Sequence, residues 1–224
     1  MKLCVCLGVD WRDQLFAYQS KAELIELRLD LMFATGMAEA QMVDTLVPLL
    51  AKINHKVILT CRVGTITQEV RHHLFLALLP LAPAYIDVEY DTPEHFRKPL
   101  YAAAQKYGTG IIASYHNGDA TPELAQLCAI ADNALLGGAH LVKIVTHSRD
   151  HWDESRLLSL YQQERFAQKI TAFCMGRFGL TSRLHAAALG APILYVAPDH
   201  GAATAPGQPC FTQFTEHLLN LHRI

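Results

Sequence analysis

The sequence has few charged residues, and neither sign of charge predominates. Charged side chains make up 18% of the 224 residues, and 19 Lys and Arg stand against 21 Asp and Glu, a net charge of −2. No run of Lys or Arg forms a basic stripe, which argues against nucleic acid as a partner. The balanced charge and the 51% of hydrophobic residues also exclude a disordered chain.

Long hydrophobic runs are absent as well. No uncharged apolar run reaches the ~18 residues that a membrane-spanning helix needs. The strongest candidate for a membrane-spanning helix, residues 74–86, is interrupted by Pro80 and Pro83. The short apolar stretch 3–9 is followed at once by charged residues and by no small-residue cleavage site, unlike a secretory signal. We therefore expect no membrane partner and a cytoplasmic location.

The six cysteines lack the paired spacing of a metal site or a redox motif. Four of them lie in apolar runs, which is typical of buried, reduced cysteines in a reducing cytoplasm. The twelve histidines show no metal-ligand spacing: His72 and His73 are adjacent, so their side chains diverge. The sequence therefore predicts no metal site.

Short apolar or β-branched runs recur eight times and alternate with segments that carry helix signals. These runs are residues 3–9, 24–30, 56–62, 84–90, 110–116, 140–146, 170–175 and 192–197. Thr92 and Thr121 each precede a proline and a glutamate, which predicts an N-cap hydroxyl and a proline at the first helical position. Apolar spacing predicts helices over 150–169 and 211–223. Three glycines stand where helices should end: Gly108, Gly137 and Gly190.

Strands that alternate with helices indicate an α/β protein with a parallel sheet. Eight units favour a closed (β/α)8 TIM barrel, here a compact single domain over residues 1–224. The alternative is a doubly wound sheet. However, Gly8 and its neighbours, which follow the first run, do not form the glycine-rich dinucleotide-binding turn.

Polar side chains gather late in several expected strands. Glu26, Arg28 and Asp30 alternate with leucines, so we expect the three charged groups to share one face. Buried charges require partners or a ligand, and barrel active sites form at the carboxyl ends of strands. We expect a polar pocket there rather than an exposed antiparallel face. The next three runs repeat the pattern with Thr60 and Arg62, Asp87 and Glu89, and Ser114 and His116.

Lys143 lies between apolar neighbours in the sixth expected strand. Burial disfavours a charged amine, and a nearby cation such as Arg62 disfavours it further. A neutral amine attacks carbonyls and forms a Schiff base. The alternative is a structural ion pair with Glu26 or Glu89. We favour Schiff-base chemistry, with His116 on the same rim as the candidate acid and base.

The last two loops carry candidate ligand-binding groups. Arg183 lies beside the expected start of a helix, where backbone N–H groups suit a carboxylate or phosphate. A simple capping turn, made by Thr181 or Ser182, is the alternative. Residues 201–208 are mostly small, and Thr204 and Gln208 are the side chains there able to grip a hydroxylated ligand. This loop is predicted to be a mobile lid.

In this order the residues resemble the type I 3-dehydroquinate dehydratases, the Schiff-base dehydratases of the shikimate pathway. The resemblance runs from the second strand to the lid. Each motif is weak alone, but their order, with His116 and Lys143 on adjacent strands, is specific. The motifs are Glu26-x-Arg28-x-Asp30, Arg62, Ser114-Tyr115-His116, Val142-Lys143-Ile144, Met175-Gly176 through Ser182-Arg183, and Ala205-Pro206-Gly207-Gln208.

The resemblance implies that the chain converts 3-dehydroquinate to 3-dehydroshikimate through a Schiff base on Lys143. His116 would take the C2 proton and return a proton to the leaving C1 hydroxyl. Arg183 would hold the substrate carboxylate. The resemblance further implies a homodimer with no cofactor and no metal. The remaining substrate-binding residues would be Glu26, Arg28, Arg62, Thr204 and Gln208.

The sequence departs from the family pattern in three places. The family usually carries a Glu-Gly-Gly loop after the third-strand arginine, and its glutamate supports the catalytic histidine; no such glutamate follows Arg62. Glu89 and Glu69 are the candidate substitutes, with Glu89 preferred because it shares the rim of the neighbouring strand. Asn117 stands where the family usually has Asp, and Thr204 where it usually has Ser.

Two other functions remain open at this point. A class I aldolase-type lyase uses the same barrel and lysine chemistry, but it usually needs a phosphate site, whereas Arg183 and Gln208 favour a carboxylate. The missing glutamate leaves room for a barrel with weakened catalysis that acts as a binding module or as part of a fusion enzyme.

Overall fold

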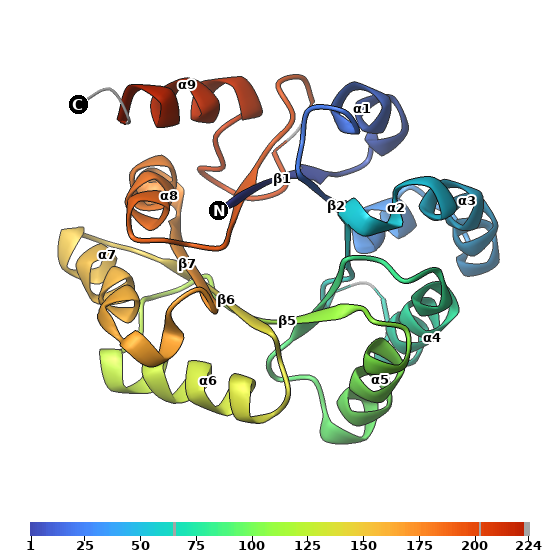
Figure 1. Ribbon diagram of the computed structural model, residues 1–224, viewed down its shortest axis with the longest axis horizontal. Coiled ribbons are helices and arrows are strands. Elements are labelled where there is room, and N and C mark those ends of the chain that lie inside the picture. Colours follow the sequence, from blue (N-terminus) through green and yellow to red (C-terminus); the bar gives the residue numbers. More distant parts are fainter. Residues whose placement is uncertain (65, 202, 222–224) are drawn as a thin grey trace.

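The computed structural model describes residues 1–64, 66–201 and 203–221. Within these ranges, eight parallel strands form one sheet in the order β7-β6-β5-β4-β3-β2-β1-β8. Figure 1 shows these strands at the centre with the helices arranged around them. The strands are β1 Lys2–Leu7, β2 Leu24–Arg28, β3 Val57–Thr60, β4 Tyr85–Glu89, β5 Gly110–Asn117, β6 Leu141–His147, β7 Ile170–Met175 and β8 Ile193–Val196.

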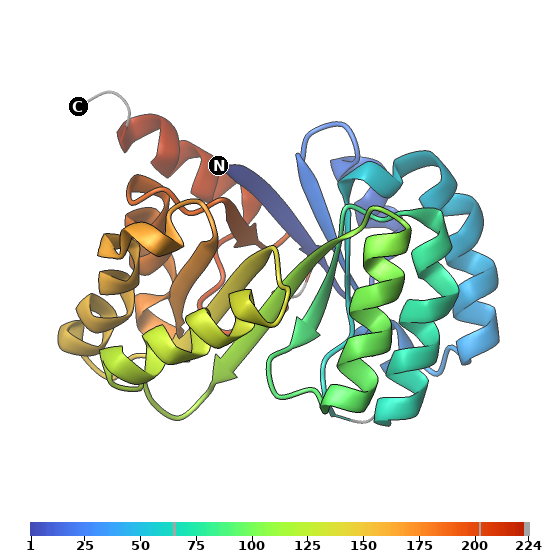
Figure 2. The same ribbon diagram turned by 60° about the horizontal axis from the view of Figure 1, so that its bottom comes forward.

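The helices connect successive strands and pack around the outside of the barrel (Figure 2). The predicted (β/α)8 barrel is confirmed. The doubly wound alternative is wrong, because consecutive strands lie side by side and the strand order does not reverse. The helices are α1 Trp11–Tyr18, α2 Leu29–Ala34, α3 Glu39–Ile53, α4 Gln68–Leu78, α5 Glu94–Lys106, α6 Leu124–Leu136, α7 His151–Leu158, α8 Gly179–Ala188 and α9 Phe211–Leu221. Within the described ranges, no helix is long and apolar enough to cross a membrane.

A side chain bridges the seam between β7 and β8. The Thr171 hydroxyl donates to the Ile193 carbonyl at 2.9 Å and accepts from the Ile193 N–H at 3.4 Å. The described residues form no backbone hydrogen-bond ladder between β7 and β8, and these side-chain hydrogen bonds link the two strands instead.

Alternate residues of each strand face opposite sides, which separates two apolar layers. The larger layer lies between the strands and the helices, and the smaller one fills the barrel interior. On β2 to β6 the inward face also carries buried polar residues, namely Glu26, Thr60, Asp87, Ser114 and Lys143. The interior layer consists of Cys4, Cys6, Leu24, Ile58, Ile112, Val145, Phe173, Ile193 and Tyr195.

Three details of the sequence prediction are wrong. First, β2 ends at Arg28 and Asp30 belongs to α2, so Asp30 does not share the strand face with Glu26. The chain turns there because Asp30 folds back to accept two hydrogen bonds from the Arg28 guanidinium, at 2.9 and 2.5 Å.

Second, the two threonine N-caps do not form. Pro93 occupies the N-cap of α5, and Thr92 Oγ1 is buried with no hydrogen-bond partner among the described residues. Glu123 occupies the N-cap of α6. The Thr121 hydroxyl lies 2.8 Å from that of Thr146 on β6, so it ties a loop to the barrel instead of capping a helix.

Third, the segment 150–169 is not one helix. After α7 it continues as two 3-10 turns, Ser159–Gln162 and Glu164–Phe166. Tyr161 explains the change, because its hydroxyl donates to the Ala172 carbonyl and accepts from the Ala172 N–H, which holds the segment against β7.

The helix-stop prediction is confirmed at Gly108 and Gly190, which follow α5 and α8 with φ of +70° and +91°. After α6, Gly137 is the C-cap, while Gly138 takes the left-handed conformation. Ala202 of the predicted lid and residues 222–223 of the last predicted helix lie outside the described residues.

Candidate active site

A pocket of about 220 Å³ opens at the carboxyl ends of the strands. Eight residues singled out from the sequence line it, although they come from three strands, one helix and two loops. The same pocket also contains four side chains that no sequence pattern indicated, Cys6, Val145, Phe173 and Tyr195, and Met175 from the motif that leads to Arg183. The eight are Glu26, Arg28, Arg62, His116, Lys143, Arg183, Thr204 and Gln208.

Lys143 points into this pocket from β6 and is 5% exposed. Its Nζ lies 3.1 Å from Asp87 Oδ2, 3.3 Å from Glu26 Oε1 and 4.0 Å from the centre of the Tyr195 ring. Of the two ion pairs considered from the sequence, the one with Glu26 forms. Glu89 instead pairs with Arg62.

Glu26 is held as a carboxylate at the base of the pocket. Burial raises the pKa of Glu26, but Lys143 and then Arg62 lower it more, to about 2. The Thr60 hydroxyl donates to Glu26 Oε1 at 2.8 Å. This oxygen therefore bridges Lys143 and the end of β3.

Asp87 is the main site residue that the sequence reasoning did not select. It is 1% exposed and accepts a hydrogen bond of 2.5 Å from Ser114 Oγ. Burial raises the pKa of Asp87, but Arg62 and then Lys143 outweigh burial and lower it. The only signal was an acid within the apolar run of β4, which marked a polar face but not a contact with Lys143.

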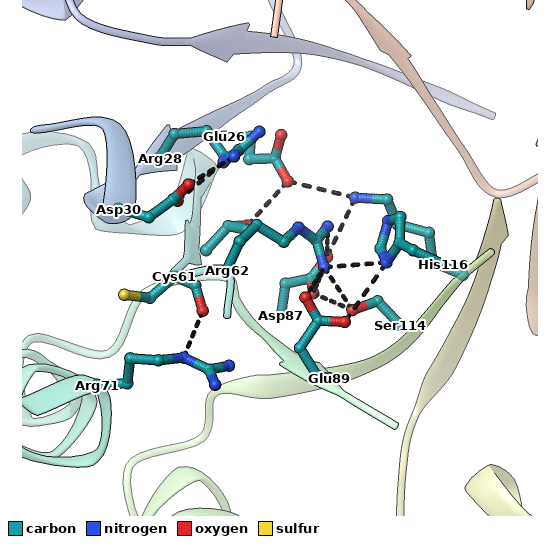
Figure 3. A network of polar contacts seen from close by, with 12 residues as sticks. Glu26, Arg28, Asp30, Cys61, Arg62, Arg71, Asp87, Glu89, Ser114 and His116 are labelled. Atoms are coloured by element: carbon teal, nitrogen blue, oxygen red, sulfur yellow. Dashed lines mark hydrogen bonds and ion pairs between the residues drawn. The ribbon is translucent and has the colours of Figure 1, made fainter. Parts of the chain in front are cut away.

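Arg62 joins the acidic groups to the histidine (Figure 3). Its Nη1 lies 2.9 Å from Glu89 Oε1, 2.8 Å from Ser114 Oγ and 3.3 Å from His116 Nδ1. Burial lowers the pKa of Arg62, but Asp87 and Glu89 raise it well above its usual value. Arg62 is therefore a permanent cation at the centre of the network.

Glu89 lies beside His116, with Oε2 at 3.4 Å from Nδ1. Burial lowers the pKa of His116 and Arg62 lowers it further, while Glu89 acts in the opposite direction. Burial raises the pKa of Glu89, but the bond to His116 and the charge of Arg62 lower it to about 2. Glu69 is exposed in the first turn of α4 and does not line the pocket.

Asn117 organises the turn after β5. Its Oδ1 accepts from the N–H groups of Asp119 and Ala120, both at 3.0 Å. Its Nδ2 donates to the Tyr115 hydroxyl at 3.3 Å. Asn117 therefore shapes the loop that follows His116 and does not bind the His116 imidazole.

Arg183 is a buried cation, 1% exposed, that stacks on Phe173 at 4.1 Å. Its Nε donates to the Tyr195 carbonyl at 3.1 Å, and its Nη1 donates to the Gly179 carbonyl at 2.7 Å. No carboxylate of the described chain lies within ion-pair distance of it. Burial lowers the pKa of Arg183 to about 10, so it remains charged at neutral pH. An unpaired buried cation that lines a pocket is suited to an anionic ligand.

The predicted lid lies at the mouth of the pocket. Gln208 Oε1 accepts from both the N–H and the hydroxyl of Thr204 at 3.0 Å, and both residues line the pocket. The loop is anchored where Gly176 N–H donates to the Pro206 carbonyl at 3.2 Å.

No group of three or more His, Cys, Asp or Glu is arranged to hold a metal ion in the part of the chain that the structure describes. The functional groups of the pocket are an amine, an imidazole, carboxylates and guanidinium groups. These groups suit acid–base and carbonyl chemistry.

Comparison with known proteins identifies relatives over nearly the whole chain. The family model for type I 3-dehydroquinase matches residues 4–224. A 3-dehydroquinate dehydratase from Pyrococcus abyssi is 33% identical over 195 residues, which cover 84% of this chain and 83% of the relative. Another from Desulfotalea psychrophila is 30% identical over 220 residues, which cover 92% of each.

Solved structures show the same fold. The type I 3-dehydroquinate dehydratase from Clostridium difficile is 22% identical, with a TM-score of 0.86 over 99% of this chain and 92% of that one. The 3-dehydroquinate dehydratase from Aquifex aeolicus is 26% identical, with a TM-score of 0.81 over the whole of both chains. Together with the family match along residues 4–224, these relatives establish that the chain belongs to the type I 3-dehydroquinase family.

Proposed function

We propose that this chain is a 3-dehydroquinate dehydratase, a hydro-lyase of the shikimate pathway that works through an imine on Lys143. One observation carries the proposal. A buried lysine, a histidine with a lowered pKa and a buried arginine without an ionic partner line the same pocket. A substrate with a ketone, an acidic C–H bond and a carboxylate matches these three groups, and family membership supplies the identity of the substrate.

The first half of the reaction forms the covalent bond. Lys143 attacks C3 of 3-dehydroquinate as its free amine, and the resulting carbinolamine takes up a proton and loses water to give a cationic imine. The positive charge withdraws electrons from C2, so its proton becomes more acidic. Glu26 and Asp87 lie beside Nζ and would stabilise this cation.

The second half eliminates the C1 hydroxyl. His116 takes the C2 proton, and the electron pair moves into an enamine. The enamine then expels the C1 hydroxyl, which leaves as water after receiving a proton from His116. Hydrolysis of the new imine releases 3-dehydroshikimate and restores the amine of Lys143.

The decisive experiment combines turnover with trapping. Purified protein and 3-dehydroquinate should yield the conjugated ketone product, followed by its ultraviolet absorbance. Borohydride added during turnover should give one covalent adduct by mass spectrometry. Turnover without an adduct would rule out the imine. If neither turnover nor an adduct is observed, the proposed function is ruled out.

We expect Arg183→Ala to weaken binding of 3-dehydroquinate by roughly 1.5–3 kcal/mol, the scale of a hydrogen bond to a charged group. The reason is the lost guanidinium, which has no carboxylate partner in the described chain. The measurement is titration calorimetry. An analogue without the carboxylate serves as the control, and an equal loss of its affinity would show that Arg183 does not bind the carboxylate.

Glu89→Gln should slow dehydration. It should also shift the acid side of the pH–rate profile, where the rate falls, to lower pH. The rate falls when His116 is protonated, and the Glu89 carboxylate raises the pKa of His116 against burial and Arg62. Removing that carboxylate lowers the pKa further, so neutral His116 persists to lower pH, below the ordinary ~6.5. The measurement is single-turnover dehydration across pH.

Glu69→Gln is the matched control for this prediction, because Glu69 is exposed on α4. Its rate and pH profile should equal those of the wild type. A Glu89→Gln variant that behaves like this control would remove Glu89 from the mechanism.

The predictions of a homodimer, a cytoplasmic location and the absence of a cofactor are part of this proposal. The homodimer and the absence of a cofactor are inferred from the family, and the cytoplasmic location from the sequence. Sedimentation velocity tests the homodimer. The absence of a cofactor predicts that activity after dialysis against a chelator equals the activity before it.

A further inference from the structure

Three glycines lie where the lid meets the start of α8. Gly207, at the end of the lid, has a φ of +71°. A methyl group added to it would overlap the Gly176 carbonyl oxygen. A methyl group added to Gly179, the first residue of α8, would overlap the Gly207 carbonyl oxygen. The lid can approach α8 this closely only because these positions lack a side chain.

The same contact includes Arg183. Its Nη1 donates to the Gly179 carbonyl at 2.7 Å and lies 3.4 Å from the Gly207 carbonyl oxygen. Its Nε is bound to the Tyr195 carbonyl, while no protein group within the described ranges accepts from Nη2. The lid backbone therefore helps to orient the guanidinium and leaves one nitrogen available to a ligand.

We propose that Gly179 and Gly207 are positioning residues that couple lid closure to carboxylate binding at Arg183. This inference rests on the proposed function, because it takes the substrate carboxylate as the ligand of Arg183. When the lid closes, Gly207 supplies a carbonyl to Arg183, and Thr204 and Gln208 reach the pocket together. Coupling is reciprocal, so carboxylate binding at Arg183 also favours the closed lid.

The first test needs no ligand. Gly179→Ala should displace the lid and free the Gly176 N–H, which otherwise donates to Pro206. Hydrogen exchange should therefore become faster in residues 203–208 and at Gly176 than in the wild type. Gly118→Ala is the control, because Gly118 has open space around its Cα and an ordinary φ. It should exchange like the wild type, and unchanged exchange in Gly179→Ala would overturn the proposal.

The second test is a double-mutant cycle for binding of 3-dehydroquinate. All proteins carry Lys143→Ala, so that only non-covalent binding is measured by calorimetry. With Arg183 present, Gly179→Ala should weaken binding about 10-fold, the lower end of the range for a hydrogen bond to a charged group. With Arg183→Ala, the same change should cost less than about 2-fold, because coupled residues are not additive. Equal losses in both backgrounds would overturn the coupling.

Two features keep this result separate from the proposed function. A wild-type protein without turnover or imine would refute the function, whereas the exchange measurement on ligand-free protein reports on the glycine contact alone. Thermal unfolding checks that each variant is folded. If Gly179→Ala does not fold, Gly207→Ala disturbs the same contact from the lid side and takes its place in both tests.

Discussion

Lys143→Ala should abolish both dehydration and borohydride trapping. Lys143 is the one lysine that lines the pocket formed by the described residues, and no other amine lies there to form the imine. Burial and the carboxylates of Glu26 and Asp87 hold Nζ in the pocket, where the substrate ketone would bind. Initial rates and the mass of borohydride-treated protein measure the two effects.

Two controls separate this chemical loss from a loss of the fold. Lys143→Arg keeps a cation near Glu26 and Asp87 but cannot form the imine, so it should be folded and inactive. Lys169→Ala removes an exposed lysine and should leave both activity and the adduct intact. An adduct that persists in Lys143→Ala would overturn the assignment.

His116→Ala should still form the imine but turn over roughly 10²–10⁴-fold more slowly, the usual contribution of a positioned proton-transfer group. Because Lys143 and its carboxylates are unchanged, the covalent adduct should accumulate. Mass spectrometry without borohydride, compared over time with product release, measures that accumulation. Turnover near the wild-type rate would remove His116 from the mechanism.

His140→Ala is the control for this variant. His140 lies at the opposite, amino-terminal end of the barrel, where its Nδ1 accepts from the Ile111 N–H at 3.0 Å. It should leave the covalent intermediate at its wild-type level. Accumulation in both variants would indicate a general disturbance of the barrel and not a role for the His116 imidazole.

Much of the fold could be predicted because the relevant physics is local. Alternation of apolar runs with capped, periodic segments indicated eight strand–helix units, and burial of both strand faces explains why charges stood out in them. Two of the three errors fell where a contact outside the segment decided the local structure. Tyr161 hydrogen-bonds to β7 and breaks a predicted helix into 3-10 turns, and Thr121 binds β6 instead of capping α6.

The candidate site was predicted as a set of residues but not as a network. Polar groups late in the strands and their order along the chain identified Lys143, His116 and Arg183. The charged partners of Lys143 and His116 lie more than 25 positions away along the chain: Asp87 is beside Lys143 and Glu89 is beside His116. The separation of two residues along the sequence does not predict such pairs, because the pairs depend on strand register and side-chain conformation.

The sequence by itself determined the alternation of elements, the family and the residue types that carry the chemistry, because these follow from patterns of neighbouring residues. Only the tertiary structure decided which charges are paired. Closure of the barrel brings Asp87 and Glu26 to Lys143, places Glu89 on His116 and leaves Arg183 without a carboxylate. The lid contact through Gly179 and Gly207 also depends on this closure. The two glycines are 28 residues apart in the chain, and the absence of a side chain at each allows close contact only once the fold has brought them together.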